Sequence, residues 1–143
     1  MPVFHQQSRV ELRRIYVDAW RKFRNSEPLE PLQAQIARLI AEHPEYHQLL
    51  EADAPAVEAE FLPEGGAQNP FLHLGLHLAI REQVNTDRPA GIRALHASLV
   101  SRLGSAHEAE HRMLEILGEI LWESQRAGTP PDEVLYIERL ESL

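Results

Sequence analysis

The feature that most constrains the fold is a helical spacing of apolar residues along nearly the whole chain of 143 residues. We find no segment in which apolar and polar residues alternate, as they do in a half-buried strand. The expected helices cover about residues 7–25, about 31–42, 70–84, a stretch that ends near Leu103, a stretch from Ser105 to about Arg126, and a short piece of the tail. The sequence therefore predicts an all-α fold, a helical bundle of about five helices with short loops, in a single all-helical domain over residues 1–143.

Local signals place the ends of these helices. Asn69 followed by Pro70 is a typical start, because asparagine caps a helix and proline fits its first turn. Gly104 is expected to end one helix, and Ser105 with a glutamate three residues later forms a capping box for the next. Pro44 is expected to break the second helix or to restart it, because the residue before a proline avoids helical backbone angles. Residues 52–69, rich in proline and glycine, are predicted to be a connecting loop.

Two helices have apolar faces that indicate how they pack. The first is predicted to turn one face inward and to flank it with two further side chains. That face holds Leu12, Tyr16, Ala19 and Phe23, and the flanking residues are Ile15 and Trp20. The helix over residues 70–84 is apolar nearly all round, which is typical of a helix in the centre of a bundle.

Charge and composition limit the partners that this chain is expected to have. The formal net charge is −8, from 14 basic and 22 acidic residues, which disfavours nucleic acid and anionic membranes as partners. Basic residues gather between Arg9 and Arg24, whereas residues 39–80 hold acidic residues and no lysine or arginine. No run is long and apolar enough to span a membrane. Without cysteine there is neither disulfide nor thiolate ligand. We expect a cytoplasmic protein with a possible protein partner or a homo-oligomeric state.

Histidines occur in pairs that share a helix face. Six of the eight histidines are spaced by four residues, whereas chance placement gives about 0.4 such pairs. The pairs are His43/His47, His73/His77 and His107/His111. One helical turn of separation allows two imidazole rings to bind one ion, and imidazole suits zinc, iron, nickel and copper.

Two of these pairs are the stronger candidates for a metal site. His73 and His77 lie on the most apolar helix, where an unsatisfied polar ring is costly. Glu110 flanks His107 and His111 and could be a carboxylate ligand or an acceptor for a ring N–H. Metal binding is therefore assigned to these five residues, with zinc, iron or nickel as the ion. The pair His43/His47 stays doubtful, since Pro44 interrupts the shared face. The alternative for every pair is a structural histidine that donates to backbone carbonyls.

Residues 107–111 read HEAEH and fit two zinc-peptidase signatures, HExxH and its inverse. Such a peptidase also needs a third ligand and a cleft, commonly edged by a strand that pairs with substrate. We find no strand in the sequence, and the helix that contains HEAEH is expected to lie within a bundle. A zinc peptidase is therefore the least favoured function.

Several segments together resemble a known family. HPEYHQLL, NPFLHLGLHLAIREQ, DRPAGIR, AEH and LGEILWESQR occur here in the order of a proteobacterial group, the domain-of-unknown-function family 1841. The resemblance covers nearly the whole chain. It implies no activity, but the recurring histidine segments of that family coincide with the three pairs. The spacing is also similar to that of helical-bundle metalloproteins of the hemerythrin and DinB-like kinds, although the later ligand run of hemerythrin is missing.

Two hypotheses of different kinds follow. The favoured one is a small bacterial helical protein that binds a transition metal through paired histidines in the interior of the bundle. The competing one is a non-enzymatic protein-interaction module in which the histidines are structural core and chelators have no effect. The sequence leaves open whether the protein is an enzyme and names no catalytic residue.

Overall fold

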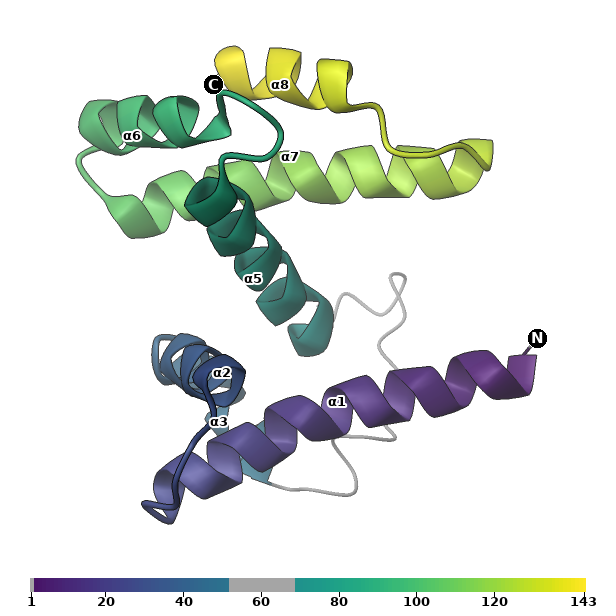
Figure 1. Cartoon of the computed structure of the whole chain (residues 1–143), viewed down its shortest axis with the longest axis vertical. Helices are drawn as coiled ribbons and strands as arrows, with labels where there is room; N and C mark the ends of the chain where they lie inside the picture. Colours follow the sequence, from purple (N-terminus) through teal and green to yellow (C-terminus); the bar gives the residue numbers. More distant parts are fainter. Residues whose placement is uncertain (1, 52–68) are drawn as a thin grey trace. The chain divides into compact units, whose positions relative to one another are not determined.

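The structure, a computed structural model, describes residues 2–51 and 69–143, with side chains from Val10 onward. These residues form seven α-helices and one 3₁₀ helix (Figure 1). The helices are α1 (Pro2–Arg24), α2 (Pro31–Ala41), η1 (Pro44–Tyr46), α3 (His47–Glu51), α5 (Pro70–Thr86), α6 (Ile92–Leu103), α7 (Ala106–Ala127) and α8 (Glu133–Glu141).

The all-α prediction is confirmed, and no strand occurs within the described ranges. The expected number of about five helices was too low. The chain after Pro44 adds η1 and α3, so of the two expectations for this proline the restart is the correct one. The short helix expected in the tail is α8. The predicted connecting loop over residues 52–69 falls almost wholly outside the described residues.

The helix ends follow from local chemistry. The Asn69 side chain accepts hydrogen bonds from the first backbone N–H groups of α5, at 3.0 and 3.3 Å. Ser105 accepts from the backbone of Glu108 at 3.1 Å and so caps α7. Gly104 ends α6 with a φ of +72°, a left-handed angle that glycine adopts without steric cost. These starts and stops were predicted from the sequence.

Contacts between Cα atoms divide the chain into two compact units, Met1–Leu74 and Gly75–Leu143, and α5 runs across the division. The single domain and the whole-chain bundle therefore stay predictions. None of the described helices is long and apolar enough to cross a bilayer.

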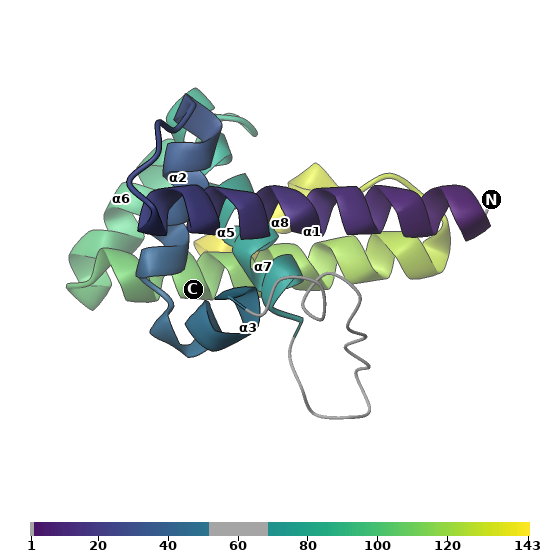
Figure 2. The ribbon, with the colours of Figure 1, turned by 90° about the horizontal axis from the view of Figure 1, so that it is seen from below.

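In the first unit α2 crosses α1 steeply, and α3 also packs against α1 (Figures 1 and 2). The buried apolar side chains of these three helices are Val17, Ala19, Trp20, Ile36, Ala37, Leu39, Ile40 and Leu50. Phe71 and Leu74, at the start of α5, are buried in the same unit. The predicted inward face of α1 is only partly correct. Leu12 and Phe23 are exposed, at 58% and 46%, whereas Arg13 is buried with its guanidinium 5.0 Å from the ring of Phe71.

In the second unit α6 and α8 both pack against α7 (Figure 1). One apolar core joins α5 to these helices, with the buried residues Ile80, Ile92, Leu99, Ala109, Met113, Leu114, Leu117, Ile120, Tyr136 and Leu140. The hydroxyl of Tyr136 donates to the side chain of Gln83 at 2.7 Å, which satisfies the one polar atom of that ring. This core holds in place the part of α5 that follows His77 and the first turns of α7. His107 and His111 lie on those turns of α7.

Candidate metal centre

The helix α5 holds His73 and His77 one turn apart, as the spacing predicted. His77 is fully buried and His73 is half-buried. Each of the two has a histidine neighbour in its own unit, and the two neighbourhoods differ.

In the first unit the rings of His43, Tyr46 and His73 lie against one another. The His43 and His73 centroids are 5.2 Å apart with the rings edge to face, and the ring of Tyr46 is stacked parallel to that of His43 at 5.5 Å. The ring of Tyr46 also meets the ring of His73 edge-on, at 5.9 Å. Burial, followed by the charge of Glu45, raises the pKa of Tyr46, so its phenol is neutral at ordinary pH.

His43 and His47 satisfy the carbonyl end of α2. The Nδ1–H of His43 donates to the carbonyl of Leu39 at 2.9 Å, and the Nε2–H of His47 donates to the carbonyl of Ile40 at 2.8 Å. The last carbonyls of a helix lack hydrogen-bond partners within the helix, and the two histidine rings provide partners for two of them. The Trp20 ring covers His47 at 4.5 Å. Pro44 therefore does prevent the pair from sharing a helix face, yet it turns both rings back onto α2.

In the second unit His77 contacts Glu110, which is in turn paired with Arg81. The Nδ1 atom of His77 lies 2.5 Å from Oε1 of Glu110, and Nε of Arg81 donates to both oxygens of Glu110, at 3.0 and 3.1 Å. Burial by itself raises the pKa of Glu110. The hydrogen bonds from His77 and Arg81 and the charge of Arg81 outweigh burial, and the net pKa is below the ordinary value. Glu110 is therefore a carboxylate at neutral pH.

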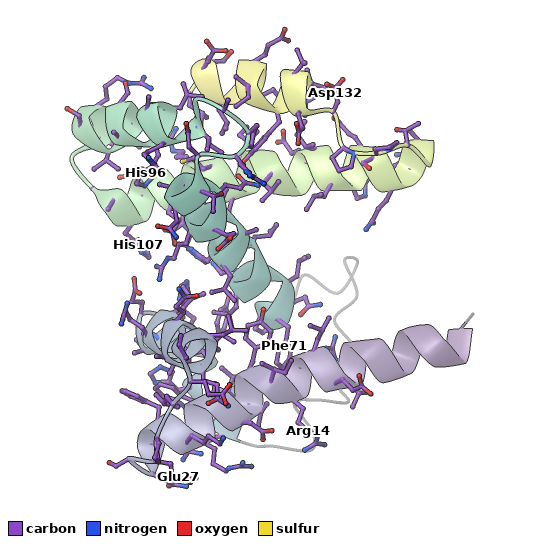
Figure 3. All side chains as sticks on the ribbon, viewed as in Figure 1. Arg14, Glu27, Phe71, His96, His107 and Asp132 are labelled. Atoms are coloured by element: carbon purple, nitrogen blue, oxygen red, sulfur yellow. The ribbon has the colours of Figure 1, made fainter. Side chains whose placement is uncertain are left out.

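His107 and His111 lie on the first turns of α7. Nδ1–H of His111 donates to the carbonyl of His107 at 3.0 Å, and the ring of His111 is 4.6 Å from the ring of His77. The ring of His107 is 4.2 Å from that of His111, but His107 is exposed at the start of the helix (Figure 3). His111 therefore has a direct ring contact to α5.

The hydrogen bonds fix the tautomers of three rings. Carbonyl and carboxylate oxygens only accept hydrogen bonds, so the ring nitrogen that faces each of them has the proton. In the neutral rings of His43, His77 and His111 that nitrogen is Nδ1. Nε2 then has the lone pair in all three. A histidine that binds a metal commonly donates its other ring N–H to a carboxylate or a backbone carbonyl in this way.

Among the described residues, the group that could hold a metal ion consists of His43, His73, His77 and His111, each of which offers one ring nitrogen. Three of these four were predicted from the helical spacing. His43 belongs to the pair that the sequence left doubtful, because Pro44 interrupts the helix face that it would share with His47. Of the other predicted residues, Glu110 is bonded to His77 as an acceptor for the ring N–H, and His107 stands beside His111.

The family model described as a domain of unknown function, DUF1841, matches residues 8–142. No match was found among curated proteins or among solved structures.

Proposed function

We infer the function of this chain from its own side chains, because the chain belongs to the DUF1841 family, a domain of unknown function whose description gives no activity. We propose that the protein binds one divalent transition-metal ion through the Nε2 atoms of three histidines and one ring nitrogen of a fourth. The three are His43, His77 and His111, and the fourth is His73.

The single observation that supports this function best is the shared tautomer of three rings. A structural histidine needs one partner for one nitrogen, and any tautomer serves. Here three rings from three helical segments all place the proton on Nδ1 and the lone pair on Nε2. Their Nδ1 acceptors are two carbonyls and one carboxylate, which are the usual outer partners of metal-binding histidines.

The chemistry of the ligands limits which ions could bind. Four imidazole nitrogens suit zinc, iron, nickel or copper and disfavour magnesium and calcium, which prefer oxygen. Zinc is the first ion to test, because it takes four nitrogen ligands readily and is insensitive to redox conditions. Four bound imidazoles would close the site and make it structural, whereas three would leave a position for water and for chemistry.

The negative charge of Glu110 has a defined part in this proposal. Glu110, whose charge Arg81 stabilises, accepts a hydrogen bond from Nδ1–H of His77 and so makes Nε2 a stronger donor to the ion. His107 remains the alternative to His43 as the fourth ligand, as the sequence suggested.

A titration with zinc tests the proposal and separates these ligands. We expect wild-type protein to bind one ion per chain, and His77→Ala to weaken binding by more than about 100-fold, since even outer-sphere changes cost 10–100-fold. His96→Ala, a half-buried histidine of α6, is the matched control and should bind as wild type. His107→Ala should also bind nearly as wild type, and a loss as large as that of His43→Ala would make His107 the ligand. Equal binding by wild type and His77→Ala would remove the proposal.

A protein-interaction module is the second candidate, and apolar exposure on α1 favours it. Leu12, Ile15 and Phe23 are 58%, 43% and 46% exposed on a helix that also has several arginines. This alternative predicts a salt-sensitive protein partner and no effect of chelators on the melting temperature. A chelator-induced drop in melting temperature would count against it.

The peptidase alternative gains no support from the site. His107 and Glu108 of the HExxH match are both exposed. Glu108 gives its backbone N–H to the Ser105 cap and has its carboxylate 3.8 Å from Arg112. We therefore keep proteolysis as the least favoured function.

A further inference from the structure

Tyr46 lies where it touches both histidines of the first unit that belong to the metal group. Its ring is parallel to that of His43, within 2°, and meets the ring of His73 at 76°. The centroid distances of 5.5 and 5.9 Å are within the range of favourable aromatic contacts. No motif or spacing in the sequence singles out this tyrosine.

The break at Pro44 is what brings Tyr46 to this place. The 3₁₀ helix η1 spans Pro44–Tyr46, and the backbone N–H of Tyr46 donates to the carbonyl of His43 at 3.0 Å. His43 precedes this turn as its N-cap, and the turn brings the ring of Tyr46 parallel to the ring of His43. An uninterrupted α-helix would instead have placed His47 on the face of His43.

A histidine ring needs more than one contact to aim its second nitrogen. The bond from Nδ1 of His43 to the carbonyl of Leu39 fixes one edge of the ring, but the terminal torsion of histidine is broad. A parallel ring on its face restricts that remaining rotation. The same tyrosine limits the tilt of His73, whose ring stands nearly perpendicular to both others.

We propose that Tyr46 is a positioning residue, whose ring holds the planes of His43 and His73 in the orientation that the ion requires. This inference rests on the proposed function. The ring surface, and not the phenol oxygen, does this work, and therefore phenylalanine should replace tyrosine without loss.

Titration of the full chain with Zn²⁺ and the visible spectrum of its Co²⁺ form test the inference. We expect Tyr46→Leu to weaken Zn²⁺ binding about 10–100-fold, as other changes around metal ligands do, and to alter the Co²⁺ spectrum. Tyr46→Phe should restore both. The matched control is Tyr16→Leu, which removes a half-buried tyrosine from the same unit whose ring packs on Phe71 at 6.0 Å. It should lower the melting temperature of the metal-free protein without changing the Co²⁺ spectrum.

The outcomes separate this inference from the proposed function. If wild-type protein binds neither ion, the proposed function fails. If wild type binds and Tyr46→Leu keeps its affinity and spectrum, only the role of Tyr46 is overturned. A Tyr46→Phe variant as weak as Tyr46→Leu would also overturn it, because the hydroxyl and not the ring would then be responsible. A Tyr16→Leu variant that weakens binding as much as Tyr46→Leu would reduce the effect to general packing and would likewise overturn it.

Discussion

The Nδ1 atom of His77 lies 2.5 Å from a carboxylate oxygen of Glu110, and both groups are largely withdrawn from water. A carboxylate can only accept, so this contact places the ring proton on Nδ1 and the lone pair on Nε2. Arg81 bonds to both oxygens of the same carboxylate and stabilises its charge. The ion pair of Glu110 and Arg81 therefore determines which nitrogen of His77 has the lone pair that a metal ion would need.

Substitution of Glu110 by glutamine should weaken metal binding without abolishing it. The amide keeps the shape of the side chain and an oxygen that can accept from His77, but it loses the negative charge that strengthens Nε2 as a donor. We expect Zn²⁺ affinity to fall about 10–100-fold while the stoichiometry stays at one ion per chain. Calorimetric titration measures both quantities. An unchanged affinity would show that the charge of Glu110 has no part in binding.

The lowered pKa of Glu110 also predicts how stability changes with pH in metal-free protein. Its pKa in the folded state is below the ordinary value of 4.5, so folding favours the ionised form. The resulting stability is fully present above pH 4.5 and is lost as the pH falls through the lower, folded-state pKa. Urea unfolding from pH 7 to pH 3 in the presence of a chelator should therefore show wild type more stable than Glu110→Gln at pH 7. The two should converge in acid, and a constant difference would contradict the assignment.

Metal release is expected at a higher pH than the loss of the Glu110 charge. Imidazole binds an ion only while neutral, and its ordinary pKa is about 6.5. Protons should compete with Zn²⁺ below about pH 6, where Glu110 is still ionised. Equilibrium dialysis at a series of pH values measures the release. Retention of the ion at pH 4 would mean that histidines are not the main ligands.

His43 and His47 should differ in their effect on metal binding, although both cap α2. His47→Ala removes a bond to the carbonyl of Ile40 and a contact with Trp20, so we expect a loss of about 1 kcal/mol in unfolding free energy and normal Zn²⁺ affinity. His43→Ala removes a comparable bond and, in addition, a ligand, so its affinity should fall by more than about 100-fold. Denaturant unfolding with chelator and a Zn²⁺ titration separate the two effects. Equal affinity of the two variants would place His43 outside the site.

The parts of the fold that the sequence predicted are those that depend on neighbouring residues. The Asn69-Pro70 start, the Gly104 stop and the Ser105 cap each involve hydrogen bonds or backbone angles within a few positions, so they could be predicted from short segments. The pairs on α5 and α7 followed from helical spacing in the same way. His77 and His111 then proved to be in ring contact within the second unit.

The parts that the sequence did not predict depend on how helices pack. Apolar residues surround much of α1, and the positions of α2 and α3 decide that Val17 is buried while Leu12 is exposed. His43 has no partner at helical spacing after the Pro44 break, and only its return onto the end of α2 places its ring beside that of His73. Spacing alone contains no information on either contact.

The measurement that tests the central claim most directly is the metal content of the purified chain of 143 residues, determined by elemental analysis after gel filtration at neutral pH. The proposed site predicts close to one transition-metal ion per chain in wild type after incubation with Zn²⁺, and close to none in a variant with His43, His77 and His111 all changed to alanine. The single variant His96→Ala should retain the wild-type content. Equal metal content in wild type and the triple variant would contradict the claim, as would the absence of any ion from wild type.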